Sequence, residues 1–162
     1  MKHDLFKKKD FFEKNGFIIL KNFLNNRIKK KLIKFANTHT FQKIKEWQDK
    51  GYIKDIKIKD KKYIYKKLVD IYLKANKPKY KRQPLYYTAN KDFFNILSDK
   101  LFIDYAKFFL GTANIRVSGT HNFRYKSLEF PWAKFAWHAD RTYWKEAEIK
   151  EFKFLTMWMT LD

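Results

Sequence analysis

Apolar residues in the first half of the chain recur at the three- and four-residue spacing of a helix with one buried side. Ile28, Leu32 and Phe35 fall at i, i+4 and i+7 on one stripe. Asn25 or Asn26, just before them, has the side chain that caps a first helical turn. The pattern predicts a long helix from this point that ends before Gly51.

Shorter elements are expected on both sides of this helix. Residues 5–15 have helical spacing and are closed by Gly16, a residue suited to the left-handed conformation at a helix end. Residues 17–20 are continuously apolar and predict a strand. Residues 52–60 alternate isoleucine with lysine or aspartate, which favours a second short strand.

Later in the chain the pattern changes from helical to extended. Helical spacing returns at residues 63–73, and residues 90–110 predict one or two helices stopped by Gly111. From Asn114 the period is two, which predicts a strand pair or one bent strand. One face of that strand would carry Ile115, Val117, Gly119, His121, Phe123 and Tyr125, and the other Arg116, Ser118, Thr120, Asn122 and Arg124.

One short segment carries candidate chemistry. His138 and Asp140 form the single His-x-Asp pattern in the chain. Residues two apart on an extended strand share a face, so an imidazole nitrogen and a carboxylate oxygen can point at one ion. Two histidines and one carboxylate bind non-haem Fe(II) on one face and leave the other open, and this pair would supply two of those ligands.

The surroundings of this pair resemble the phytanoyl-CoA dioxygenase family of Fe(II)- and 2-oxoglutarate-dependent oxygenases. The likeness begins in residues 11–24, FFEKNGFIILKNFL, as a short helix closed by glycine, an apolar strand and a turn into a longer helix. It continues in the same order with a helical stretch before Gly111, paired strands, the WHAD segment at 137–140 and a strand of the form LTxW at 155–158.

The resemblance implies an activity and a set of site residues. His138 and Asp140 would bind Fe(II), 2-oxoglutarate would be the cosubstrate and O2 the oxidant, and the enzyme would hydroxylate a small organic substrate that the resemblance does not name. Trp158 would lie beside 2-oxoglutarate, although burial in the core is the alternative for a tryptophan in so aromatic a chain.

Further positions follow from the same resemblance. The family's cosubstrate contact on the preceding strand aligns near Asn122, within a residue or two. Arg124 shares that polar face, where Asn122 or Arg124 would contact a carboxylate, and Arg124 would line the substrate pocket. In an ordinary antiparallel sheet this face would instead be solvated. Trp137 and Trp144 flank the metal motif and either shape the substrate pocket or pack against it.

The implied fold is α+β, with N-terminal helices packed on a double-stranded β-helix of the jelly-roll or cupin type. We expect a single domain over residues 1–162, in which residues 1–111 are a mainly helical support and residues 112–162 form the first strands of the barrel. No histidine follows His138, whereas the family has a distal histidine and a 2-oxoglutarate-binding arginine there. The chain is therefore expected to be a fragment that is not active alone, with a vestigial non-catalytic protein as the alternative.

The charge of the chain suggests a competing function. The net charge is +20, and residues 1–81 alone contribute +17 from 24 Lys, one Arg and eight acidic residues. Such a surface suits an anionic partner such as nucleic acid, and lysine with interleaved aromatic residues can follow phosphates and stack on bases. Because Lys outnumbers Arg 32 to 5, solvated helix faces are the preferred interpretation and nucleic-acid binding the alternative.

Composition adds three exclusions. With no cysteine, the chain has neither a disulfide framework nor a thiolate site. No apolar run is long enough to cross a membrane, and the first residues do not form a signal peptide. A cytoplasmic location is therefore expected.

Overall fold

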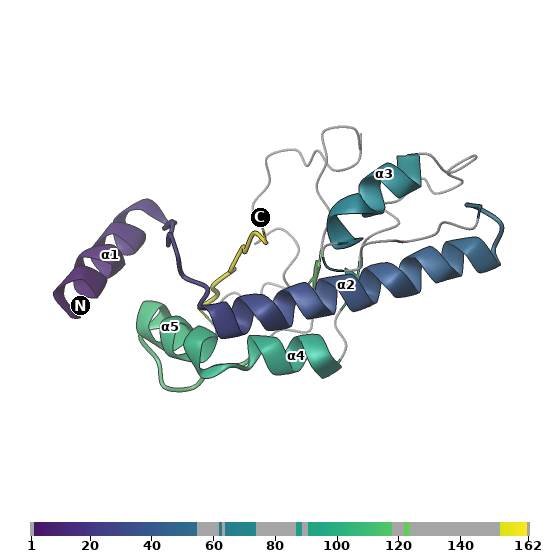
Figure 1. The fold of residues 1–162 in the computed structure, drawn as a ribbon. Helices are drawn as coiled ribbons and strands as arrows, with labels where there is room; N and C mark the ends of the chain where they lie inside the picture. Colours follow the sequence, from purple (N-terminus) through teal and green to yellow (C-terminus); the bar gives the residue numbers. More distant parts are fainter. Residues whose placement is uncertain are drawn as a thin grey trace.

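The computed structural model describes residues 2–54, 62, 64–73, 87–88, 91–117, 122–123 and 153–161. The helices are α1 (Lys2–Asn15), α2 (Asn26–Asp49), α3 (Leu68–Leu73), α4 (Lys91–Leu97) and α5 (Lys100–Leu110), and a 3-10 turn, η1 (Ile64–Lys67), leads into α3. Strands β1 (Tyr87–Thr88) and β2 (Asn122–Phe123) form one antiparallel pair. Figure 1 shows α4 and α5 along one side of α2, and α3 along another.

Helix α2 begins and ends where the sequence predicts. The side chain of Asn25 accepts a hydrogen bond from the backbone N–H of Ile28 at 2.9 Å, which satisfies one of the free donors of the first turn. After Asp49 the backbone leaves the helix, and Gly51 follows with a φ of 67°. The predicted stripe is buried, since Ile28, Leu32 and Phe35 are at most 7% exposed.

The buried face of α2 contributes to two apolar clusters. The first half of the helix packs against α4 and α5, and the second half against η1, α3 and the turn at Ile53. The buried members of the first cluster are Ile28, Leu32, Phe35, Phe93, Ile96 and Phe102. Those of the second are Ala36, Ile44, Trp47, Ile53, Ile64, Tyr65 and Leu68. Leu161 packs against both clusters, and Tyr65 Oη donates a hydrogen bond to the Leu161 carbonyl at 2.9 Å.

The predicted helical region at residues 90–110 is two helices because Asp99 caps the second. Its carboxylate accepts from the N–H of Leu101 at 3.2 Å. The same carboxylate receives both terminal nitrogens of Arg27 from α2, Nη1 at 2.8 Å and Nη2 at 2.9 Å. Gly111 ends α5 in the left-handed conformation, as predicted.

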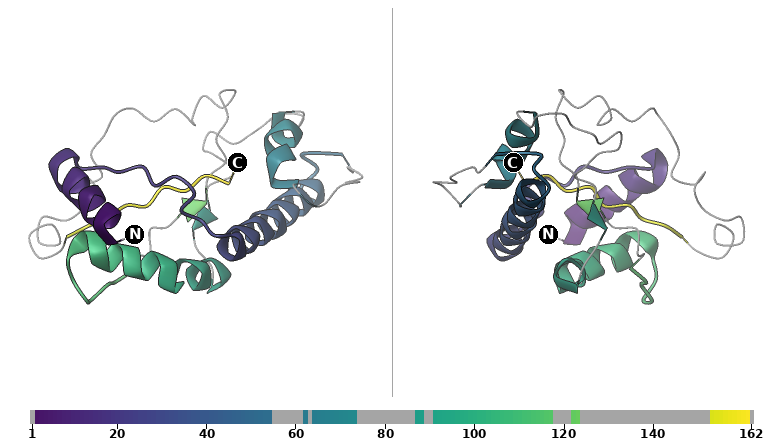
Figure 2. Two further views of the ribbon diagram at one scale, coloured as in Figure 1. Left: turned by 60° about the vertical axis from the view of Figure 1, so that its left-hand side comes forward. Right: turned by 90° about the vertical axis from the view of Figure 1, so that its right-hand side faces the viewer.

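Helix α1 lies against α5 through aromatic side chains (Figure 2). The rings of Phe12 and Phe109 meet edge to face at 5.2 Å, and Lys9 Nζ lies 5.5 Å from the centre of the Phe108 ring. Gly16, with a φ of 76°, then turns the chain away from the helix, as predicted.

The extended segments do not form the predicted strands. Residues 17–20 and 153–161 are extended but pair into no strand with other described residues. Within 153–161 burial alternates: Met157 and Met159 pack against the first cluster, while Trp158 is 70% exposed. The predicted strand at 52–60 is also not seen at its start, because residues 52–54 form a bend after α2, and residues 55–60 lie outside the described part.

The predicted fold, an incomplete double-stranded β-helix, is therefore wrong for the described part of the chain. That part is 64% helical, and its strands are limited to the two-residue β1 and β2. Alternating burial requires an extended backbone with one covered side. In residues 153–161 that side is covered by side chains of α2, α4 and α5 and not by a neighbouring sheet.

We predict that the two roles of Asp99 can be separated by substitution. Asp99→Ala removes the cap of α5 and should lower the free energy of unfolding by about 1 kcal/mol relative to Asp99→Asn, which keeps a capping oxygen and loses the charge that Arg27 binds. Denaturant unfolding of the two variants measures the difference. Equal stabilities would show that the cap contributes nothing.

Candidate functional site

Most predicted site residues lie outside the described part of the chain. These are the metal-ligand pair His138 and Asp140, together with Arg124, Trp137 and Trp144. Their roles remain predictions.

Asn122 is placed by its backbone. It lies in β2, where its Cα partner is Thr88 of β1. The pairing brings together two positions that are far apart in the sequence, so a segment between α3 and α4 lies beside the predicted cosubstrate contact.

Trp158 is fully described and is not a core residue. Its neighbours Met157 and Met159 turn toward the core, while Trp158 and Phe154 face away and are 70% and 43% exposed. The alternative of core packing is therefore wrong, and the role beside 2-oxoglutarate stays a prediction.

His39 is buried in the core. It is 5% exposed on the core face of α2 and stacks on the ring of Phe35, with the ring planes 10° apart. Burial lowers its pKa to about 4, and the nearby Lys43 acts in the same direction. His39 is consequently neutral at pH 7.

Within the described residues, no three histidine, cysteine, aspartate or glutamate side chains gather to hold a metal ion. His138 and Asp140, one imidazole and one carboxylate, stay the ligands that the sequence predicts for Fe(II).

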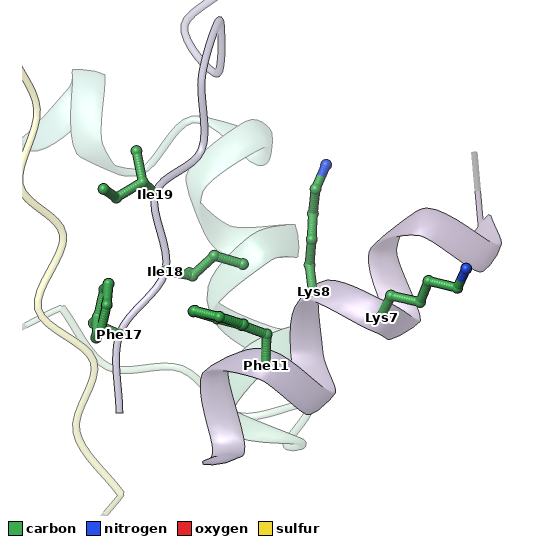
Figure 3. Close-up of a pocket in the computed structure, with 6 residues that line it drawn as sticks. All are labelled: Lys7, Lys8, Phe11, Phe17, Ile18 and Ile19. Atoms are coloured by element: carbon green, nitrogen blue, oxygen red, sulfur yellow. The ribbon is translucent and has the colours of Figure 1, made fainter. Parts of the chain in front are cut away.

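An open apolar groove lies between α1 and the extended segment that follows it (Figure 3). It encloses about 350 Å³. Figure 3 shows Ile18 and the ring of Phe11 pointing toward one another, with the Lys8 chain extending beside them. The groove is lined by Lys7, Lys8, Phe11, Phe17, Ile18 and Ile19.

The groove has a definite chemical character. Phe17 and Ile19 remain 56% and 75% exposed, and the rings of Phe11 and Phe17 meet edge to face at 5.7 Å. The lining of the groove is mostly apolar, and Figure 3 shows the side chains of Lys7 and Lys8 extending away from the apolar ones. Sequence reasoning assigned these residues to a helix and a strand and missed the groove; the signal was the pair of apolar runs on either side of the Gly16 turn.

Comparison with known proteins gives no match. No family model matches the chain, and neither a curated protein nor a solved structure matches it. The likeness to the phytanoyl-CoA dioxygenase family therefore stands on the sequence motifs alone. Among the described helices, none is both long enough and apolar enough to cross a membrane.

The low pKa of His39 predicts acid sensitivity. The unfolded histidine binds a proton near pH 6.5, whereas the folded one does so only near pH 4. The contribution to stability is therefore complete above pH 6.5 and is lost as the pH falls toward 4, by up to roughly 3 kcal/mol. Unfolding free energies measured across this range give the slope.

His39→Gln is the matched control, because it keeps a polar side chain of similar size without the titration. Its stability should vary much less between pH 6.5 and 4. The carboxylates of Asp99 and Glu46, whose pKa values are lowered by hydrogen bonds from Arg27 and from Lys43 and Lys50, contribute equally in both proteins. Parallel pH profiles would rule out His39 as the cause.

Proposed function

We propose that the chain belongs to a non-haem Fe(II)- and 2-oxoglutarate-dependent dioxygenase and supplies His138 and Asp140 as metal ligands. The observation that carries this proposal is the single His-x-Asp pattern within the aromatic segment WHADRTYW at residues 137–144. When bound, Fe(II) with 2-oxoglutarate and O2 supplies the oxidising power to hydroxylate a small organic substrate and releases succinate and CO2.

The donor types suit the metal. An imidazole and a carboxylate are the ligands that ferrous sites of this kind use, and two of them fill two positions on one face of the ion. The chain has no cysteine, so no thiolate competes for the metal. The imidazole binds a metal only when it is neutral, so metal affinity should be weaker in acid.

The order of elements near the N-terminus supports the same proposal. A helix closed by a left-handed glycine, Gly16, leads into an extended apolar segment and then into the long helix α2, capped by Asn25. That order is the one on which the family resemblance was based. Trp158, which the resemblance assigns to the cosubstrate, lies on the side of its segment that faces away from the core and is 70% exposed.

The metal-ligand assignment predicts a specific loss of binding. With Co(II) as a spectroscopic probe for Fe(II), the 162-residue chain should bind one equivalent, and His138→Ala or Asp140→Ala should each weaken binding by at least about tenfold. Titrations followed by visible absorption measure this. His3→Ala, which removes a histidine from α1, is the matched control and should bind as the parent does.

Undiminished binding in His138→Ala would contradict the proposal. Equal weakening in His3→Ala would also count against it, because the metal would then be held by histidines in general.

Trp158 provides a separate test of the cosubstrate site. Because a bound 2-oxoglutarate chelates the metal, it should tighten Co(II) binding in the parent chain. Trp158→Ala should reduce this effect by about tenfold, since the indole no longer packs against the cosubstrate, and leave metal affinity without 2-oxoglutarate unchanged. Phe154→Ala, on the same exposed side, is the control. Identical behaviour of the two variants would reject the role of Trp158.

A further inference from the structure

Helix α2 carries an unbalanced charge on the side that faces away from the core. Its first 20 residues, 26–45, contain seven Lys and Arg and no acidic residue. Arg27, Lys30, Lys31, Lys34 and Lys45 are all exposed.

These exposed cations form a line. The intervals between positions 27, 31, 34 and 45 are four, three and eleven residues, each close to a whole number of helical turns. Lys30 lies one turn before Lys34. We call Lys30, Lys31, Lys34 and Lys45 the basic ridge. With Arg27 at its start, the line is roughly 27 Å long, at 1.5 Å per residue. Figure 1 shows α2 as one continuous helix over this length.

The carboxylates near the ridge are already paired with cations outside it. Asp99 is paired with Arg27 at 2.8 Å, and Glu46 is paired with Lys43 and Lys50 at 2.6 Å each. Within the described part of the chain, Lys30, Lys34 and Lys45 make no ion pair. Lys31 interacts electrostatically with Asp99, but the carboxylate of Asp99 is paired with Arg27.

The arrangement is unfavourable for the helix alone. Arg27 and Lys31, and likewise Lys30 and Lys34, are like charges at i and i+4, which repel. The first turn contains no acidic residue and lies at the positive end of the helix dipole. A polyanion laid along the ridge removes both penalties.

We propose that the basic ridge binds the phosphate backbone of double-stranded nucleic acid without reading its sequence. Lysine is a point charge that contacts phosphates without the bidentate geometry of base recognition, and phosphate contacts carry no sequence information. Single strands require exposed aromatic platforms. The one aromatic residue beside the ridge, Phe41, instead packs against the second core cluster.

The proposal predicts a salt dependence. Anisotropy titrations of the 162-residue chain with a fluorescent 20-base-pair DNA duplex should give a log Kd that varies with log salt with a slope of about 4, because four lysines displace counterions. The variant Lys30→Gln, Lys31→Gln, Lys34→Gln, Lys45→Gln should lose nearly all of this slope and at least tenfold in affinity at 100 mM salt.

A charge-matched control separates the ridge from the net charge. Lys14, Lys21, Lys107 and Lys153 are exposed outside α2, and their replacement by Gln removes the same four charges. This control should keep the slope of the parent within about one unit. Equal losses in the two variants would overturn the proposal, because binding would then follow overall charge.

Two further measurements complete the test. The four-lysine variant should unfold at or above the melting temperature of the parent, because repulsion between lysines of α2 is relieved. If the variant is much less stable and binds DNA normally at a lower temperature where it is folded, the proposal is wrong.

Polyglutamate at equal charge concentration should compete poorly with the duplex. If polyglutamate competes as strongly as unlabelled duplex, the ridge binds acidic proteins and the proposal is wrong. Tighter binding of single-stranded than of double-stranded DNA would also contradict it.

Discussion

Burial of one face of α2 is the constraint on which the described structure depends. Its first half completes the cluster with α4 and α5, and its second half the cluster with η1 and α3. Arg27 fastens the start of α2 to Asp99, the cap of α5, and Asn37 in its middle donates to the Lys62 carbonyl at 2.7 Å. Residues 64–73 and 91–110, which are far apart in the sequence, are thus both held by contacts with a single helix.

The two sides of α2 have different roles: the buried side forms the core, and the exposed side carries the basic ridge. Residues on the inner side are apolar apart from Thr40 and His39, and burial keeps His39 neutral; the outer side carries the lysines that meet solvent. The apolar groove of α1 lies in another element, and the proposed metal pair lies in another segment of the chain. Loss of a ridge lysine therefore affects a surface, whereas loss of Leu32 or Trp47 removes part of a core.

Helices were predictable from the sequence because their signals are local. The stripe through Ile28, Leu32 and Phe35, the Asn25 cap and the Gly111 stop each act within a turn or two of the chain. The β-helix, which the family resemblance implied, is wrong for the described residues because the covered side of residues 153–161 packs on helices and not on a sheet. His39 continues the stripe of α2 one turn after Phe35 and is buried with it, although histidine is a polar residue type. The roles of His138, Asp140, Asn122, Arg124, Trp137, Trp144 and Trp158 rest on motif likeness and remain predictions.

Amide hydrogen exchange of the 162-residue chain tests the central role of α2 most directly. If α2 holds the structure together, amides of residues 28–47 should be the slowest to exchange, and the segments of α4, α5 and η1 that pack on it should follow. Residues 17–20, which form no described strand, should exchange much faster. Exchange in α2 as fast as in residues 17–20, with protection retained in α4 and α5, would contradict the account.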